Sequence, residues 1–163
     1  MTALTSITAV LGLLGSALVG GIFFAFSSFV MKALARVPAH EGIAAMQSIN
    51  VVVLNPSFLG TFAGTALASI IAAWVAVMTW GDPAAPWLLG GALLYLGGTF
   101  LLTGVGNVPL NEKLAAIAAA DPGAVETWEH YLDRWTRLNT ARTVASLSAA
   151  AMFTVGLVQS VTA

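Results

Sequence analysis

The stretch MTALTSITAVLGLLGSALVGGIFFAFSSFVM, residues 1–31, contains no Asp, Glu, Lys or Arg. Three further stretches share this property: residues 42–81, 83–111 and 143–163. A hydrocarbon core about 30 Å thick requires roughly 20 mostly apolar residues per helix. The sequence therefore predicts an all-α polytopic membrane protein in which four helices cross the membrane as a bundle.

The composition favours a single membrane domain. The chain has 163 residues, of which 58% are hydrophobic and 8% charged, whereas about 25% are charged in soluble domains. Spans at about residues 4–34, 56–80, 87–105 and 139–161 leave no room for a separate soluble domain. The formal net charge of −1 argues against nucleic acid as a partner. Cysteine is absent, which excludes thiolate chemistry and disulfides.

The basic residues predict the orientation in the membrane. All six Lys and Arg residues fall within residues 32–36 or 113–142, the connections after the first and third spans. By the positive-inside rule, both connections face the cytoplasm and both termini lie on the non-cytoplasmic side. We expect short amphipathic helices in these connections, at residues 41–54 and 112–120. The predicted location is the plasma membrane of a bacterium.

Small residues recur at four-residue spacing in the first two spans, which indicates close helix packing. They are Gly12, Ser16 and Gly20 in the first span, and Gly60, Gly64, Ala68 and Ala72 in the second. We expect these two faces to meet. Small-residue faces serve contacts between subunits equally well, so a homo-oligomer stays open.

Polar side chains gather near the predicted cytoplasmic ends of the spans. They are Asn50, Asn55, Asn107, Asn111, Asn139 and Arg142. On the last helix Trp128, Tyr131 and Trp135 share one face with Asn139 and Arg142. One interpretation is an interfacial aromatic belt with a snorkelling arginine, in which the asparagines cap or tie helices. The other is a pocket in which amide oxygens surround the guanidinium, which carries five N–H donors.

No metal site is predicted. Glu126, Glu129, His130 and Asp133 lie close together in sequence, but carboxylate-bridged metal sites in helical bundles use Glu-x-x-His motifs, and this chain has none.

Several motifs in order along the chain resemble the anthrone-oxygenase-like family of small integral membrane proteins. They are Gly21-Ile-Phe-Phe-Ala-Phe-Ser27 with Phe29-Val-Met31, Met46-Gln47-x-Ile49-Asn50, Asn55-Pro56-x-Phe58, Gly106-Asn107-x-Pro109-Leu110-Asn111, and Trp128-x-x-Tyr131-x-x-x-Trp135-x-x-x-Asn139-x-x-Arg142. The resemblance implies four transmembrane helices and oxidation of an anthrone-type or phenolic aromatic to a quinone by O₂, without a cofactor.

The implied chemistry assigns roles to the polar and aromatic residues. Arg142 and Asn139, with Asn50, Asn55, Asn107 and Asn111, would bind the substrate and its oxyanion. Trp128, Tyr131 and Trp135 would stack on a planar ring. His130 is the expected base, although it lies off the stripe of Trp135 and Arg142, and a water bound by an asparagine is the alternative. The alternative is a non-catalytic membrane protein that binds a small hydrophobic molecule or lipid, or an accessory membrane subunit.

Overall fold

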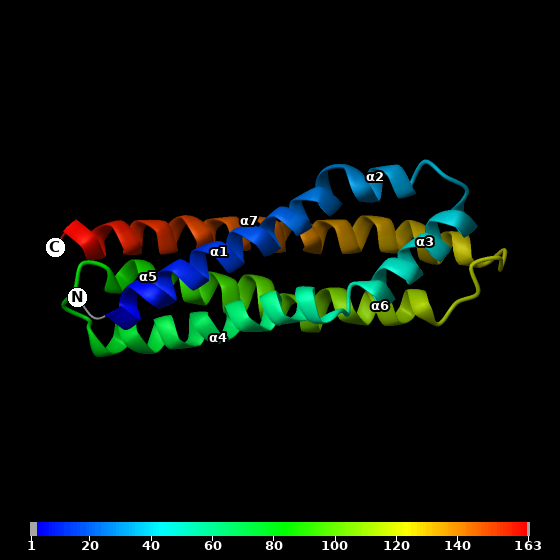
Figure 1. Ribbon diagram of the computed structural model, residues 1–163. Helices are drawn as coiled ribbons and strands as arrows, with labels where there is room; N and C mark the ends of the chain where they lie inside the picture. Colours follow the sequence, from blue (N-terminus) through cyan, green and yellow to red (C-terminus); the bar gives the residue numbers. More distant parts are fainter. Residues whose placement is uncertain (1–2, 163) are drawn as a thin grey trace.

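The computed structural model describes residues 3–162, which form helices joined by short turns, with no strand among them (Figure 1). The elements are α1 (Ala3–Ala25), η1 (Phe26–Val30), α2 (Met31–Leu34), α3 (Ala39–Val52), α4 (Pro56–Met78), α5 (Ala85–Tyr95), η2 (Leu96–Leu101), η3 (Thr103–Asn107), α6 (Val108–Ala115) and α7 (Ala124–Thr162). The η elements are π-helical segments within longer continuous helices.

Four helices of the described chain are long and apolar enough to cross a membrane: Ala3–Leu34, Pro56–Met78, Ala85–Ala115 and Ala124–Thr162. Large apolar side chains point outward from them, as Leu14 does with 62% of its surface exposed. In water such a surface would drive association, whereas in a bilayer it faces lipid tails. The protein is a multi-pass integral membrane protein built as a helical bundle.

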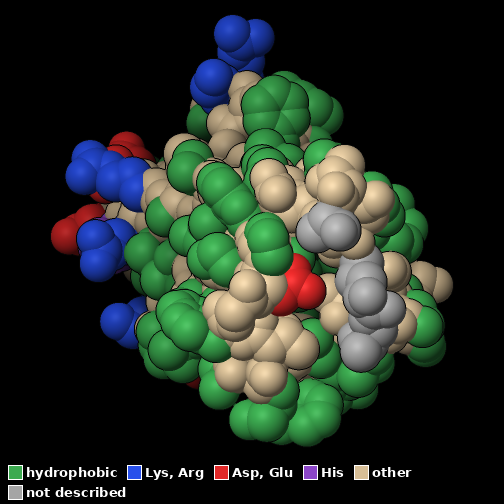
Figure 2. Space-filling model, turned by 90° about the vertical axis from the view of Figure 1, so that its left-hand side faces the viewer, with side chains coloured by type: hydrophobic (Ala, Val, Ile, Leu, Met, Phe, Trp, Pro, Cys, Tyr) green, Lys and Arg blue, Asp and Glu red, His purple; other side chains and the backbone are tan. Residues whose placement is uncertain are grey.

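The two ends of the bundle differ. Both chain ends and the turn between α4 and α5 lie at one end, and the α2–α3 and α6–α7 connections lie at the other (Figure 1). Viewed from the end with the termini, the surface is mostly apolar or uncharged, with Lys and Arg only at its margin (Figure 2). The basic residues of α2, α6 and the first half of α7 therefore belong to one end, as the sequence predicted.

Polar side chains start two of the spans. Asn55 Oδ1 accepts the Phe58 N–H at 3.0 Å, and Pro56 occupies the first turn of α4, where its missing N–H has no helical partner to lose. Asp82 Oδ1 accepts the Ala84 N–H at 2.8 Å in the turn before α5. These local contacts explain why both spans begin within two residues of their predicted starts.

The third span is longer than the sequence predicted. The sequence predicted a span that ends at residue 105 and a separate helix over residues 112–120, but the helix continues from Ala85 to Ala115. The π-helical segment η3 directly precedes the turn that holds Pro109. A widened turn accommodates a proline that lacks an N–H and would clash with the carbonyl four residues earlier in a regular α-helix.

The small-residue faces also pack differently from the prediction. Gly12 and Gly20 of α1 face α7, where an added Cβ would lie 2.7 Å from the Phe153 ring and 2.9 Å from Leu147, respectively. Gly60 and Gly64 of α4 have no atom within 4 Å of an added Cβ. Gly12 and Gly20 therefore pack against the last helix, and Gly60 and Gly64 take no part in a close helix contact, whereas Ala68 and Ala72 of the second face are buried in the bundle.

Two hydrophobic clusters divide the bundle along its length. One lies among α1, α4, α5 and α7 and includes the fully buried Tyr95 and Phe153. The other joins α2, α3, α6 and the first half of α7, with Met46, Tyr131 and Trp135 at its centre. Arg142 lies where these clusters adjoin, because its guanidinium contacts Phe23 of the first cluster and Trp135 of the second.

Candidate functional site

A cavity of about 560 Å³ opens between the helices at this junction. Such a volume lies within the range of about 300–1,000 Å³ typical of small-molecule sites. Most of its wall is apolar, with Phe23 and Phe26 from the first span, Phe58 and Phe62 from α4, and Phe100 from η2. Its polar lining consists of Gln47, Asn50, Thr103, Asn111, Glu112, Trp135 and Arg142.

Arg142 is the unusual member of this lining. It is only 4% exposed, and no carboxylate of residues 3–162 lies within ion-pairing distance of it. Its Nη2 donates to Asn139 Oδ1 at 2.7 Å and its Nη1 to Thr103 Oγ1 at 3.0 Å. The buried Nε–H has no partner. Of the five donors of a guanidinium, two are therefore used by the protein.

Aromatic rings hold the guanidinium in place. Its Cζ lies 4.1 Å from the centroid of the Phe23 ring and 5.3 Å from that of Trp135. Cation–π contacts of this kind are worth about 2 kcal/mol when desolvated. They stabilise the positive charge but do not neutralise it, so Arg142 presents a positive charge to its end of the cavity.

Asn139 connects the first helix to α7 beneath Arg142. Its Nδ2 donates to the Phe23 carbonyl oxygen and to Ser27 Oγ, each at 2.7 Å, while its Oδ1 accepts from Arg142. All of its hydrogen-bonding atoms are thus occupied within the protein. Asn139 positions Arg142 and does not line the cavity.

A second network fixes Asn111 on the cavity wall. Asn111 Oδ1 accepts from Trp135 Nε1 and from the Tyr131 hydroxyl, both at 2.8 Å. An indole N–H is only a donor, so the atom facing it is the amide oxygen, and Nδ2 points the other way. Asn50 Nδ2 contacts the Tyr131 hydroxyl at 3.4 Å, which leaves its own oxygen as an acceptor.

The remaining predicted residues lie outside the cavity. His130 is exposed on α7, Asn55 is the exposed N-cap of α4, and Trp128 is buried against Gly42 and stacked on Tyr131. Asn107 is buried and donates to the Trp135 carbonyl oxygen at 3.3 Å. The structure therefore brings Asn50, Asn111, Trp135 and Arg142 to the cavity, with Tyr131 and Asn139 behind them.

Sequence reasoning did not single out Phe23, Thr103 or Glu112 as site residues. Phe23 stands within the Gly21–Ser27 motif, which was a usable signal. Thr103 carried none, because threonine hydroxyls in membrane helices usually bond to a carbonyl of their own helix, as this one does to Thr99 at 2.7 Å.

The three π-helical segments all border this site. Ser27 of η1 contacts Asn139, and Phe100 of η2 lines the cavity. Thr103 of η3 bonds to Arg142. π-bulges are rare and occur frequently at functional sites.

A family profile described as anthrone oxygenase matches residues 53–152. The chain belongs to the anthrone oxygenase family. The matched region includes the cavity walls formed by α4, η2, η3 and α6, and also Asn139 and Arg142. No curated protein and no solved structure matched the chain.

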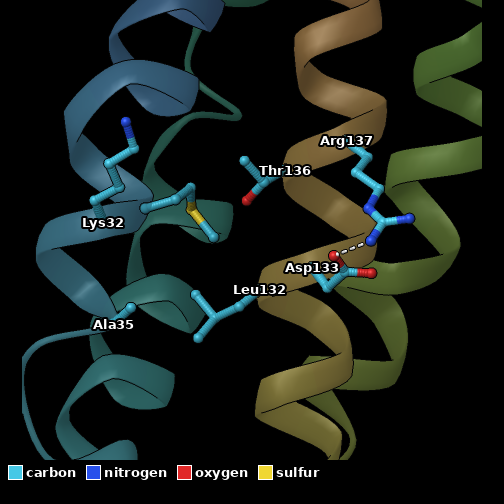
Figure 3. Close-up of a pocket in the computed structure, with 7 residues that line it drawn as sticks. Lys32, Ala35, Leu132, Asp133, Thr136 and Arg137 are labelled. Atoms are coloured by element: carbon cyan, nitrogen blue, oxygen red, sulfur yellow. Dashed lines mark ion pairs between the residues drawn. The ribbon is translucent and has the colours of Figure 1, made fainter.

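A shallower hollow of this anthrone oxygenase family member lies between α2 and α7 (Figure 3). Its charged residues include Asp133 and Arg137 on α7, which form an exposed ion pair at 2.8 Å, and Lys32 on α2. Exposed pairs contribute little energy, and their charges already compensate each other. Arg142, by contrast, has no ion-pair partner among the described residues, and the larger cavity that it lines is therefore the candidate functional site.

Proposed function

We propose that this protein is a membrane-embedded, cofactor-independent oxygenase that oxidises an anthrone-type or phenolic aromatic to a quinone with O₂. The observation that supports this proposal is the buried Arg142 guanidinium, which lines an apolar cavity without a carboxylate partner. A buried cation without a counter-charge is costly, and an anionic ligand would remove that cost. An aromatic enolate combines the flat apolar body and the single negative oxygen that such a cavity accepts.

The reaction can be written in balanced steps. Loss of a benzylic proton from the anthrone leaves its electron pair as an enolate, whose oxygen the guanidinium would bind. The enolate gives one electron to O₂, and the resulting radical and superoxide combine to form a carbon–oxygen bond. The protonated peroxide then loses the second benzylic proton as its O–O bond breaks, which gives the quinone carbonyl and one water.

The protein would contribute mainly electrostatic stabilisation and orientation. Preorganised donors to a developing oxyanion contribute about 3–4 kcal/mol each to lowering a barrier. Phe23, Phe58 and Phe62 line the space that a planar ring would occupy. We further propose that the substrate enters from the lipid phase, and that the cavity faces the cytoplasmic leaflet with both termini on the opposite side.

Oxygen uptake tests the proposal. Purified protein in detergent is mixed with anthrone and ¹⁸O₂, and uptake, quinone absorbance and label are followed with and without a chelator. We expect catalysed uptake with one labelled oxygen in the quinone. Arg142→Lys keeps the charge but cannot reach both Thr103 and Asn139 in the same geometry, so its kcat should fall about 10²–10³-fold.

The absence of catalysed uptake with anthrone and with hydroxylated anthrones would contradict the proposal. If anthrone nevertheless quenches tryptophan fluorescence saturably, and Arg142→Met abolishes this quenching, the cavity is the binding site of a non-catalytic protein.

A further inference from the structure

Glu112 is an acidic side chain that lines the same cavity as Arg142. It belongs to a face of α6 formed by Val108, Asn111, Glu112 and Ala115, all of which line the cavity. Their spacing of three, four and seven residues from Val108 is that of one helix face. The carboxylate is therefore presented to the cavity by the geometry of the helix and not by a flexible loop.

Glu112 and Arg142 lie toward opposite ends of the cavity. Thr103, which bonds to Arg142, precedes Glu112 by nine residues, and this corresponds to at most about 14 Å at the α-helical rise of 1.5 Å per residue. Side chains on a helix lean toward its N-terminus. The third span and α7 run in opposite directions (Figure 1). By helix geometry, the Cα–Cβ bonds of Glu112 and Arg142 therefore tilt toward each other along the axis of the bundle.

This arrangement matches the two reacting positions of an anthrone. The carbonyl oxygen and the benzylic C–H lie on opposite edges of the central ring, so a group that binds the oxygen and a group that takes the proton must face each other across the substrate. No other aspartate, glutamate or histidine of residues 3–162 lines this cavity. His130, which the sequence suggested as the base, is exposed on α7 outside it.

Glu112 is also placed to release a proton. The residue is exposed, and the neighbouring Lys113 is exposed as well. Because two charged side chains in succession favour water over lipid, we expect this end of the cavity to be in contact with water. Asn111 beside it is held rigidly by Trp135 and Tyr131 and presents its amide N–H groups away from them. A base with access to water can return to its ionised form after each turnover.

We infer that Glu112 is the general base of the proposed reaction: it takes the benzylic proton of a substrate whose oxygen is bound by Arg142. The C–H bond breaks, the Glu112 carboxylate receives the proton, and the electron pair remains on the substrate as the enolate. The proton then passes to water. This inference rests on the proposed function, but it concerns a step that precedes reaction with O₂.

Proton abstraction can therefore be tested without oxygen. Anthrone is incubated anaerobically in D₂O with the full-length protein in detergent, and deuterium at the benzylic carbon is measured by mass spectrometry above the protein-free rate. We expect Glu112→Gln to lower the catalysed exchange at least 10-fold and Glu112→Asp to restore part of it. Glu129→Gln, which changes an exposed carboxylate of α7 outside the cavity, should exchange as the wild type does.

Anaerobic quenching of tryptophan fluorescence by anthrone shows whether Glu112→Gln still binds. Retained binding with lost exchange supports the base. If Glu112→Gln and the wild type catalyse deuterium exchange at the same rate, or if neither catalyses it, Glu112 is not the general base. Oxygen uptake by the wild type is read separately, so failure of the base and failure of the oxygenase are distinguishable.

Discussion

Replacing Asn139 with leucine is expected to destabilise the bundle strongly. The substitution removes three hydrogen bonds of 2.7 Å, to the Phe23 carbonyl oxygen, Ser27 Oγ and Arg142 Nη2. A hydrogen bond to a charged group contributes about 1.5–3 kcal/mol, and each neutral one about 1 kcal/mol. The expected loss is therefore about 3–5 kcal/mol, because Arg142 stays buried and charged with one partner fewer.

The apparent melting temperature should report this loss. At about 2–4 °C per kcal/mol for a chain of this size, Asn139→Leu should unfold about 6–20 °C below the wild type in detergent, as followed by circular dichroism. Thr154→Val on the same helix is the matched control, since it removes a single intrahelical bond to the Ala150 carbonyl oxygen. Its melting temperature should change by less than 4 °C, in line with about 1 kcal/mol.

A double variant separates the lost charge contact from simple loss of packing. Asn139→Leu combined with Arg142→Met removes both the charge and its partner, so we expect it to recover at least half of the stability lost in Asn139→Leu. If Asn139→Leu melts within 2 °C of the wild type, or if the two substitutions simply add, then Asn139 does not support a buried charge as argued.

Two further substitutions test the site and the helix packing. Thr103→Asp places a carboxylate beside Arg142 and should compensate the positive charge that the substrate would meet. Oxygen uptake with anthrone should therefore be more than 10-fold slower than in the neutral control Thr103→Asn. Equal uptake rates in the two variants would show that an uncompensated positive charge is not required. Gly12→Ala puts a methyl group 2.7 Å from the Phe153 ring and should lower the stability by about 1–3 kcal/mol. In the control Gly21→Ala the methyl group meets nothing within 4 Å, so this variant should be as stable as the wild type or more stable. If Gly12→Ala melts at or above the temperature of Gly21→Ala, the observed packing of α1 on α7 is contradicted.

The membrane spans could be predicted from charge alone because the physical penalty is large. A charged side chain in hydrocarbon is costly enough that charge-free stretches of sufficient length identify spans. The start of the second span could also be predicted, because Asn55-Pro56 combines an N-cap residue with a proline in the first helical turn, and the structure confirms both. The continuation of the third helix past Asn107 could not be predicted, because local signals do not show that a π-helical turn absorbs Pro109.

The site was only partly predictable because side-chain partners depend on which helices are neighbours. The spacing of Trp135, Asn139 and Arg142 placed them on one face, and the structure confirms this. Asn139 binds the guanidinium, but two other asparagines expected around it bind elsewhere: Asn111 holds Trp135 and Tyr131, and Asn107 holds a backbone carbonyl. Thr103, which does bind Arg142, comes from a helix whose packing the small-residue patterns did not indicate.

The irregular helices explain how a charge is kept free inside the bundle. A buried arginine is usually paired with a carboxylate, which neutralises its charge. Here η1 presents Ser27 next to Asn139, and η3 presents the Thr103 hydroxyl to Arg142. These neutral oxygens, with the Phe23 ring, hold the guanidinium without cancelling its charge. A carboxylate at the same place would compensate the charge but would occupy the position that the anionic substrate proposed here requires, so neutral partners fit the proposed binding of that substrate.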